Sequence, residues 1–230
     1  MIDLSLARIF SRACVGAGRV LLAQRKLGSS LNRFTRALRV QLGYQNNNSP
    51  LSSEDISTIS LHLVCVPLQD VAETLTHLGN LYYEQDNIDR AVQCYVKSFE
   101  IYTISLGPNH VDTAEVSNKL GKVLLVLGRF SEAEQYILRA HQIFLHNLGE
   151  HHRNISMALL NLGILYASKR CHKRAFEVYY HVLKDEQVTF NGEAHSDLGF
   201  TLHCIASHQH MKELSNWTKL SNTIEKNSWF

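Results

Sequence analysis

The sequence predicts an all-α protein made of stacked antiparallel helix pairs, an α-solenoid, on the strength of three observations. Sets of similar residues recur at one fixed interval along the chain. Inside each interval, apolar and small residues are spaced as on one face of a helix. The 230 residues include only 3 prolines and 12 glycines, fewer than the many turns of an all-β protein need.

Several residue sets share the same interval. Leu-Gly pairs end at Gly79, Gly121 and Gly163, which gives a constant interval of 42 (121 − 79 and 163 − 121). Further sets agree with this interval: Ala91, Ala133 and Ala175; Tyr82, Leu124 and Tyr166; Tyr95, Ile137 and Tyr179; His110 and His152. Agreement at so many positions indicates one structural unit repeated along the chain.

Each unit is expected to contain two helices. Leu75, Leu78, Gly79 and Tyr82 lie at i, i+3, i+4 and i+7, on one face of a first helix, and the same spacing starts again at Ala91. Small residues at Gly79 and Ala91 allow the two helices to approach closely.

Two predicted helix starts carry a capping-box pattern. Asp112 is followed by Glu115 at a first helix, and Ser131 by Glu134 at a second helix. In such a box the side chains of both residues satisfy backbone N–H groups at the helix start.

These residues resemble the tetratricopeptide repeat. Its usual unit has about 34 residues, and the longer unit with Leu-Gly-x-x-His between repeats is similar to the kinesin-light-chain type. The string DVAETLTHLGNLYYEQDNIDRA at residues 70–91 carries the resemblance most clearly. The resemblance implies a right-handed superhelix, in which the last units are often atypical.

The predicted organisation follows from the repeat. Residues 70–211 form the array, with repeats at about 70–107, 112–149 and 154–190, a partial fourth at 196–211, and a degenerate cap at 212–230. Residues 44–69 are expected to be a linker or divergent segment.

Residues 1–43 have more than one interpretation. The first 53 residues carry eight Arg or Lys and one acid, Asp3. Arg8, Arg12 and Arg19 share one side of a helix with Lys26, and apolar residues lie opposite. The segment is either a mitochondrial transit peptide, a divergent opening helix pair, or a helix in peripheral contact with a membrane surface.

The resemblance also implies a binding groove on the concave face, lined by first helices. Carried over to this chain, the groove residues are Glu73, Thr76, Asn80, Tyr83 and Glu84; Glu115, Asn118, Lys122, Leu125 and Val126; and Met157, Leu160, Ile164, Ala167 and Ser168. This lining changes from acidic to apolar, and predicts a guest with a basic stretch and an apolar anchor. Thr76 stands where carboxylate-clamping repeats have a paired Lys or Asn, so clamping is not expected.

No residue pattern predicts catalysis or a cofactor. There is no phosphate-binding loop, GxSxG or HExxH motif. Cys204 and His208, at i and i+4, would share a helix face as zinc ligands can. Because their segment keeps the repeat register, a His-rich exposed face is the simpler interpretation.

Charge, cysteine content and hydropathy limit the partners. The five cysteines form no CxxC pair, which favours a reducing compartment. No apolar run approaches the roughly 20 residues of a membrane span. Basic residues cluster at 169–174, where a turn between helices belongs, and aromatic residues at core spacing argue against nucleic-acid stacking.

We therefore expect a non-enzymatic adaptor or scaffold that binds a protein or peptide of unknown identity in the cytoplasm. One alternative is a mitochondrial assembly or maintenance factor from which residues 1 to about 40 are removed on import. The other alternative is a metal-dependent enzyme using Cys204 and His208. No sustained heptads occur, so a motor-subunit role is not expected.

Overall fold

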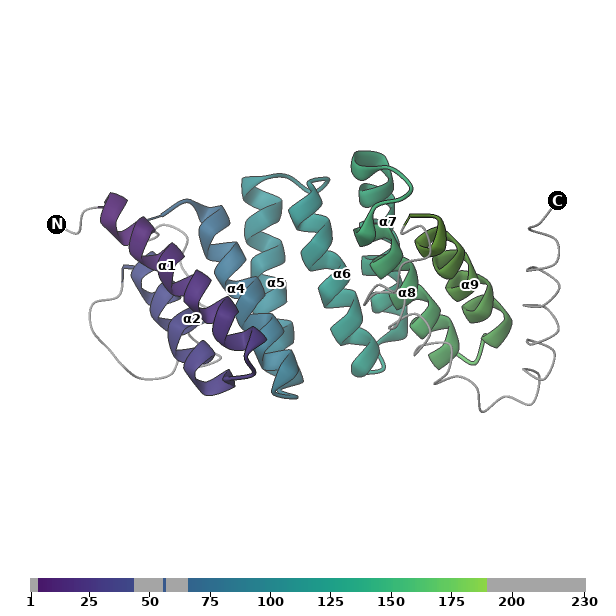
Figure 1. The fold of residues 1–230 in the computed structure, drawn as a ribbon, viewed down its shortest axis with the longest axis horizontal. Coiled ribbons are helices and arrows are strands. Elements are labelled where there is room, and N and C mark those ends of the chain that lie inside the picture. The colour runs from purple at the N-terminus through teal and green to yellow at the C-terminus, as the bar shows by residue number, and fades with distance from the viewer. Residues whose placement is uncertain (1–3, 44–55, 57–65, 190–230) are drawn as a thin grey trace. The chain divides into compact units, whose positions relative to one another are not determined.

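The protein is an all-α solenoid of consecutive helix pairs, which confirms the predicted fold class. The computed structural model describes residues 4–43, 56 and 66–189. These residues form no strand; their helices are α1 (Leu4–Ala23), α2 (Leu27–Gln41), α4 (Leu68–Glu84), α5 (Ile88–Ser105), α6 (Val111–Val126), α7 (Phe130–Leu148), α8 (Arg153–Ser168) and α9 (His172–Thr189) (Figure 1). The expected partial fourth repeat at 196–211 and the cap at 212–230 lie outside the described residues.

The chain divides into two units, Met1–Ala158 and Leu159–Phe230, with the boundary inside α8. In the first unit, α1 packs against α2, α4 against α5, and α6 against α7. Each pair also contacts the next pair, through α2 on α4 and α5 on α6. This nearest-neighbour packing is typical of solenoid proteins, in which every hairpin buries a face of the one before it.

In each of the four hairpins among the described residues, a glycine of the first helix faces a large side chain of the second. A Cβ placed on Gly79 would lie 2.6 Å from Cε1 of Tyr95, and one on Gly18 would lie 2.7 Å from Cε1 of Phe34. Gly121 against Ile137, and Gly163 against Tyr179, are closer still. A larger residue at these positions would force the facing side chain or its helix to shift, which costs stability.

The turns that join first and second helices share one conformation. Each contains a residue at positive φ: Arg25 (56°), Asp86 (58°), Gly128 (72°) and Arg170 (60°). The N–H of the following residue bonds to the carbonyl five positions earlier, as Lys26 does to Leu21 and Asn87 to Tyr82, at 2.9 and 2.8 Å. This is the Schellman pattern, which satisfies the last carbonyls of the first helix.

Helices α1 and α2 have the register of a repeat. Gly18 and Phe34 have the same separation in sequence as Gly79 and Tyr95 (34 − 18 and 95 − 79). The repeat interval of 42 does not extend to this hairpin, because the step from Gly18 to Gly79 is 61 (79 − 18). Residues 4–42 therefore form a hairpin of the same geometry as those that follow.

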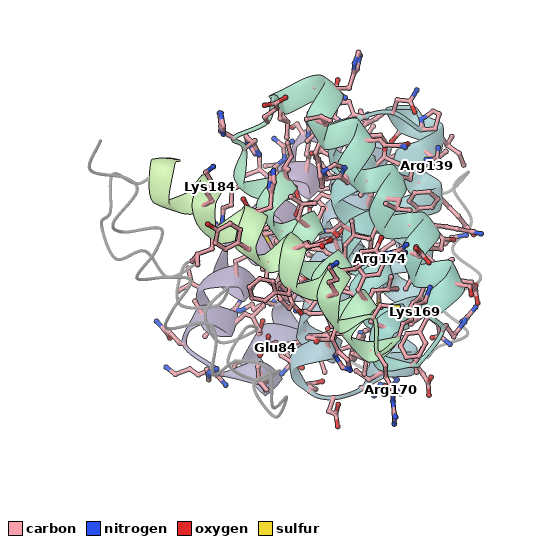
Figure 2. All side chains as sticks on the ribbon, turned by 90° about the vertical axis from the view of Figure 1, so that its right-hand side faces the viewer. Glu84, Arg139, Lys169, Arg170, Arg174 and Lys184 are labelled. Carbon is pink, nitrogen blue, oxygen red and sulfur yellow. The ribbon has the colours of Figure 1, made fainter. Side chains whose placement is uncertain are left out.

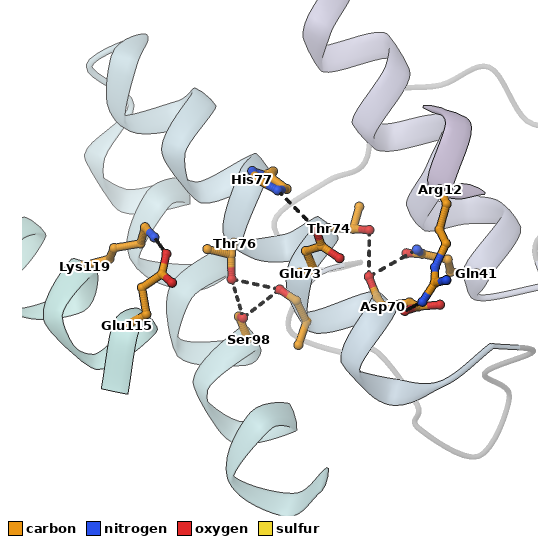
Figure 3. Close-up of polar contacts among 11 residues, drawn as sticks. Arg12, Gln41, Asp70, Glu73, Thr74, Thr76, His77, Ser98, Glu115 and Lys119 are labelled. Carbon is orange, nitrogen blue, oxygen red and sulfur yellow. Dashed lines mark hydrogen bonds and ion pairs between the residues drawn. The ribbon is translucent and has the colours of Figure 1, made fainter. Parts of the chain in front are cut away.

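Asp70 ties this first hairpin to α4. Its carboxylate accepts from Nε of Arg8 at 3.0 Å and from Nη2 of Arg12 at 2.9 Å. The backbone carbonyl of Asp70 accepts from Nε2 of Gln41, in α2, at 3.2 Å (Figure 3). The Asp70 side chain is buried, so α1 and α2 both depend on one residue in the first turn of α4.

The two predicted capping boxes are wrong. Helix α6 begins at Val111, and Nδ1 of His110 accepts from the backbone N–H of Asp112 at 3.2 Å. His152 makes the same 3.2 Å bond at the start of α8, which explains why the two histidines recur with the repeat. Helix α7 begins after Arg129, whose guanidinium pairs with Glu132 instead of receiving a side-chain cap.

Substituting one packed and one open glycine tests the contact inside the hairpins. Gly121→Ala places a methyl group against Ile137 and 3.3 Å from the carbonyl oxygen of Ala133, and should lower the unfolding free energy by about 1–3 kcal/mol. Gly16→Ala meets nothing within 4 Å and should raise stability by about 0.5–1 kcal/mol through helix propensity. Urea unfolding measures both; equal effects would contradict the packing role of Gly121.

Removing one carboxylate tests the attachment of the first hairpin. Asp70→Asn abolishes both ion pairs, which lie partly in solvent, and should cost about 1–2 kcal/mol. Asp89→Asn is the control, since Asp89 also lies in the first turn of a helix but is exposed. Thermal unfolding followed by circular dichroism should separate the two variants, and an equal loss would mean that only the helix dipole is involved.

Candidate protein-interaction surface

The expected groove residues of α4 differ widely in accessibility. Glu73 and Glu84 are exposed, and Glu73 is paired with Nε2 of His77 at 3.6 Å. Thr76 is buried, and its hydroxyl bonds to the Ala72 carbonyl at 2.9 Å and to Oγ of Ser98 at 2.8 Å (Figure 3). Its polar group is therefore used within the repeat.

Asn80, also expected in the groove, is half-buried and serves the hairpin contact. Its Oδ1 accepts from the hydroxyl of Tyr95 at 2.8 Å. Burial raises the pKa of Tyr95, so this phenol stays protonated and remains a donor. The amide oxygen of Asn80 thus has an internal partner, and the residue both supports packing and borders the surface.

The expected residues of α6 fall into two groups. Asn118 and Leu125 are buried. Glu115 is exposed and pairs with Lys119 (Figure 3). Val126, at the end of the helix, is exposed.

A cation–π contact connects α4 and α6. Nζ of Lys122 lies 4.5 Å from the centroid of the Tyr83 ring, and both residues are half-buried. Such a contact places the ammonium group over the electron-rich face of the ring. It brings together two residues that the resemblance had placed in the groove.

The remaining expected residues lie farther along the chain. Met157, the last of them in the first unit, is exposed. In the second unit Leu160 and Ala167 are buried in the cluster around Tyr179, and Ile164 packs against it. Ser168 is exposed and donates to the Ile164 carbonyl at 2.9 Å.

A surface hollow lies beside the Tyr83–Lys122 contact. It is lined by Tyr83, Glu84, Asp86, Ile88 and Val126. Tyr83, Ile88 and Val126, here called the apolar floor, contribute apolar side chains to this lining, and Glu84 and Asp86 contribute exposed carboxylates. The arrangement suits an apolar side chain that is followed or preceded by a positive charge.

Sequence reasoning included Tyr83, Glu84 and Val126 but missed Asp86 and Ile88. Those two belong to the turn and to the first residue of α5, outside the first helix. The predicted turn could have pointed to both residues, because a loop at the end of a rigid hairpin often carries binding residues.

The basic cluster at 169–174 surrounds the turn from α8 to α9. Figure 2 shows Lys169, Arg170 and Arg174 around this turn, with Lys184 farther along α9. Arg170 has positive φ and its side chain is exposed. The cluster therefore lies at the turn of its repeat that is equivalent to the turn containing Asp86.

The described residues offer no arrangement for metal or nucleophilic chemistry. Among them, no three His, Cys, Asp or Glu side chains come together as metal ligands would. Burial raises the pKa of Cys94 to about 12, which keeps this thiol protonated and unreactive. Cys204 and His208 lie outside the described residues.

None of the described helices combines the length and the apolar character needed to span a bilayer.

The chain belongs to the tetratricopeptide repeat family. The family model matches residues 70–144 and 114–184, which together cover half of the chain. None of the curated proteins compared with the chain matches it. Tetratricopeptide arrays are in general protein-interaction adaptors, and their fold is typically non-enzymatic.

Solved structures show the same fold. BtubC (BKLC) from P. vanneervenii is 16% identical with a TM-score of 0.61, covering 97% of this chain and 91% of that one. The TPR-like repeats of a kinesin-light-chain-type protein from Podosopora anserina are 13% identical with a TM-score of 0.67, covering 100% and 99%. A variant of those repeats has a TM-score of 0.66 at 13% identity and covers 96% of each chain.

A double-mutant cycle tests the internal role of Asn80. Asn80→Ala leaves the buried Tyr95 hydroxyl without its acceptor and should cost about 1–2 kcal/mol of unfolding free energy. In a Tyr95→Phe background the same change should cost about 1 kcal/mol less, measured by urea unfolding. Identical costs in the two backgrounds would contradict the hydrogen bond.

Proposed function

We propose that the protein is a non-enzymatic adaptor whose array holds a segment of another polypeptide at the hollow beside α4 and α6. The observation that carries this proposal is the hollow itself, which joins an apolar floor to two carboxylates. A floor of this kind removes one apolar side chain from water, which is the usual source of affinity for a short segment.

The charges suggest the guest's sequence. Glu84 and Asp86 form no ion pair with any other residue of the described ranges, and both are exposed. Lys122 is held over Tyr83 and does not neutralise them. We infer a guest with an aliphatic or aromatic anchor and a Lys or Arg within a few residues of it.

Exposed groove residues extend this surface. Glu73 and Glu115 are exposed acids of α4 and α6, next to His77 and Lys119, and Met157 is an exposed apolar side chain of α8. The hydrogen bond with His77 lowers the pKa of Glu73, which keeps this carboxylate charged at neutral pH. These residues support a basic segment running along the first helices.

We place this function in the cytoplasm. The packing of residues 4–42 on α4 supports a segment that stays with the folded protein, because Arg8, Arg12 and Gln41 all bind Asp70 of α4. For the same reason we favour the adaptor over the mitochondrial assembly factor with a cleaved leader.

Selection from a random peptide library tests the proposal. The protein should enrich peptides with an apolar residue next to Lys or Arg, and Val126→Asp should reduce that enrichment at least about tenfold by charging the apolar floor. Glu84→Lys with Asp86→Lys should reverse the preference toward acidic neighbours. Lys is tolerated at position 86, since Arg25 and Arg170 occupy the same turn position.

The matched control is Glu150→Lys with Glu177→Lys, two exposed acids that do not line the hollow. It should enrich the same peptides as the unchanged protein. If the Glu84 and Asp86 substitutions leave the selected sequences unchanged, or no common motif emerges, the hollow is not the binding site.

A further inference from the structure

Helix α1 exposes the face with which later first helices pack against the preceding hairpin. Aligning Gly18 with Gly79 and Gly121 matches Phe10, Ala13, Ala17 and Val20 to residues of α4 and α6. Phe10 is 39% exposed and Val20 57%, and Ala13 and Ala17 are exposed as well. In α1 this stripe of four residues, here called the α1 stripe, lacks the helix that covers it elsewhere.

The equivalent residues in the other first helices of this unit are all buried. In α4 they are Val71, Thr74, Leu78 and Leu81, each 0% exposed. In α6 they are Thr113, Val116, Leu120 and Val123, each 1–2% exposed. Helix α2 packs against α4, and α5 packs against α6. The geometry that suits this stripe is therefore a packed α-helix.

Apolar exposure continues beyond the α1 stripe. Leu6 and Ile9 are 63% and 66% exposed, so the uncovered apolar surface runs along most of α1. Contiguous exposed apolar surface of this kind marks an interaction site more often than a solvated face.

The charged residues of α1 and α2 are all basic. Residues 4–43 contain eight Arg or Lys and no acid. Arg19, Arg33 and Arg36 are exposed, and the Arg36 guanidinium lies 4.9 Å from the centroid of the Phe10 ring. Arg8 and Arg12 share the single carboxylate of Asp70 and stay about half exposed. An occupant must therefore bring negative charge.

We propose that the α1 stripe binds an amphipathic helix of a partner protein, with an apolar face flanked by acidic residues. The apolar face packs on the α1 stripe as α2 packs on α4, and the acids pair with Arg36 of α2, which lies over the Phe10 ring beside the stripe. A second copy of this chain is a poor occupant, since two faces of the same positive charge repel each other.

The probe is an acidic version of the helix that covers the same face in α6. It is a labelled, terminally blocked peptide of residues 88–105 with Arg90→Glu and Lys97→Glu, which changes its net charge from 0 (2 − 2) to −4. Fluorescence anisotropy with the full chain should give a dissociation constant of about 10–100 µM. The neutral parent peptide should bind at least about threefold more weakly, because it lacks the acids.

Variants of the full chain assign the binding surface. Ile9→Glu with Val20→Glu should weaken peptide binding at least about tenfold without changing the circular dichroism melt, because both side chains are exposed. The control, Ile104→Glu with Leu145→Glu, changes two exposed apolar residues on α5 and α7 and should leave binding unchanged.

Three results would overturn the proposal. The first is no saturable binding up to about 1 mM peptide. The second is binding to vesicles containing phosphatidylserine that depends on Ile9 and Val20 while the peptide does not bind, which would make α1 a membrane-surface helix. The third is self-association in sedimentation velocity that the same two substitutions abolish.

Discussion

The fold depends on one close contact, repeated in every hairpin: a glycine of the first helix against a large side chain of the second. Gly18, Gly79, Gly121 and Gly163 each occupy this position. The paired helices approach closely at the glycine. The opposite faces of the two helices then pack on the neighbouring hairpins. The Schellman turns accompany the contact, since all four have the same hydrogen bond and a residue at positive φ. A stack of similar hairpins follows from this local geometry and needs no long-range pairing.

The same packing decides which side chains remain for function. Thr76, Asn118 and Leu160 share one repeat position and are all buried, so their chemistry serves the fold. Our proposals therefore rest on residues that the packing leaves in water. Glu84 and Asp86, at the end of a first helix and in its turn, are exposed. Phe10 and Val20 of α1 are exposed as well, whereas the equivalent residues of α4 and α6 are buried.

Part of the site could be predicted because groove positions follow the helical register from Gly79. That reasoning included Tyr83 and Val126, which line the hollow. It could not include Ile88, because this residue joins the hollow from a second helix, whose inward faces depend on how the two helices pack. Nor could register alone show that Asn80 accepts from Tyr95, a bond that crosses the hairpin. Contacts between residues of different helices cannot be inferred from the residue spacing within a single helix.

The sequence alone determined the repeat length, the three helix pairs between residues 68 and 189 and the requirement for small residues between paired helices. These depend on local spacing, which a linear pattern records. Only the tertiary structure decided that residues 4–42 form a hairpin of the same kind, because the longer step from Gly18 to Gly79 breaks the interval. It also decided which apolar faces are covered. Burial depends on the neighbouring helix, and the same stripe is core in α4 and α6 but surface in α1.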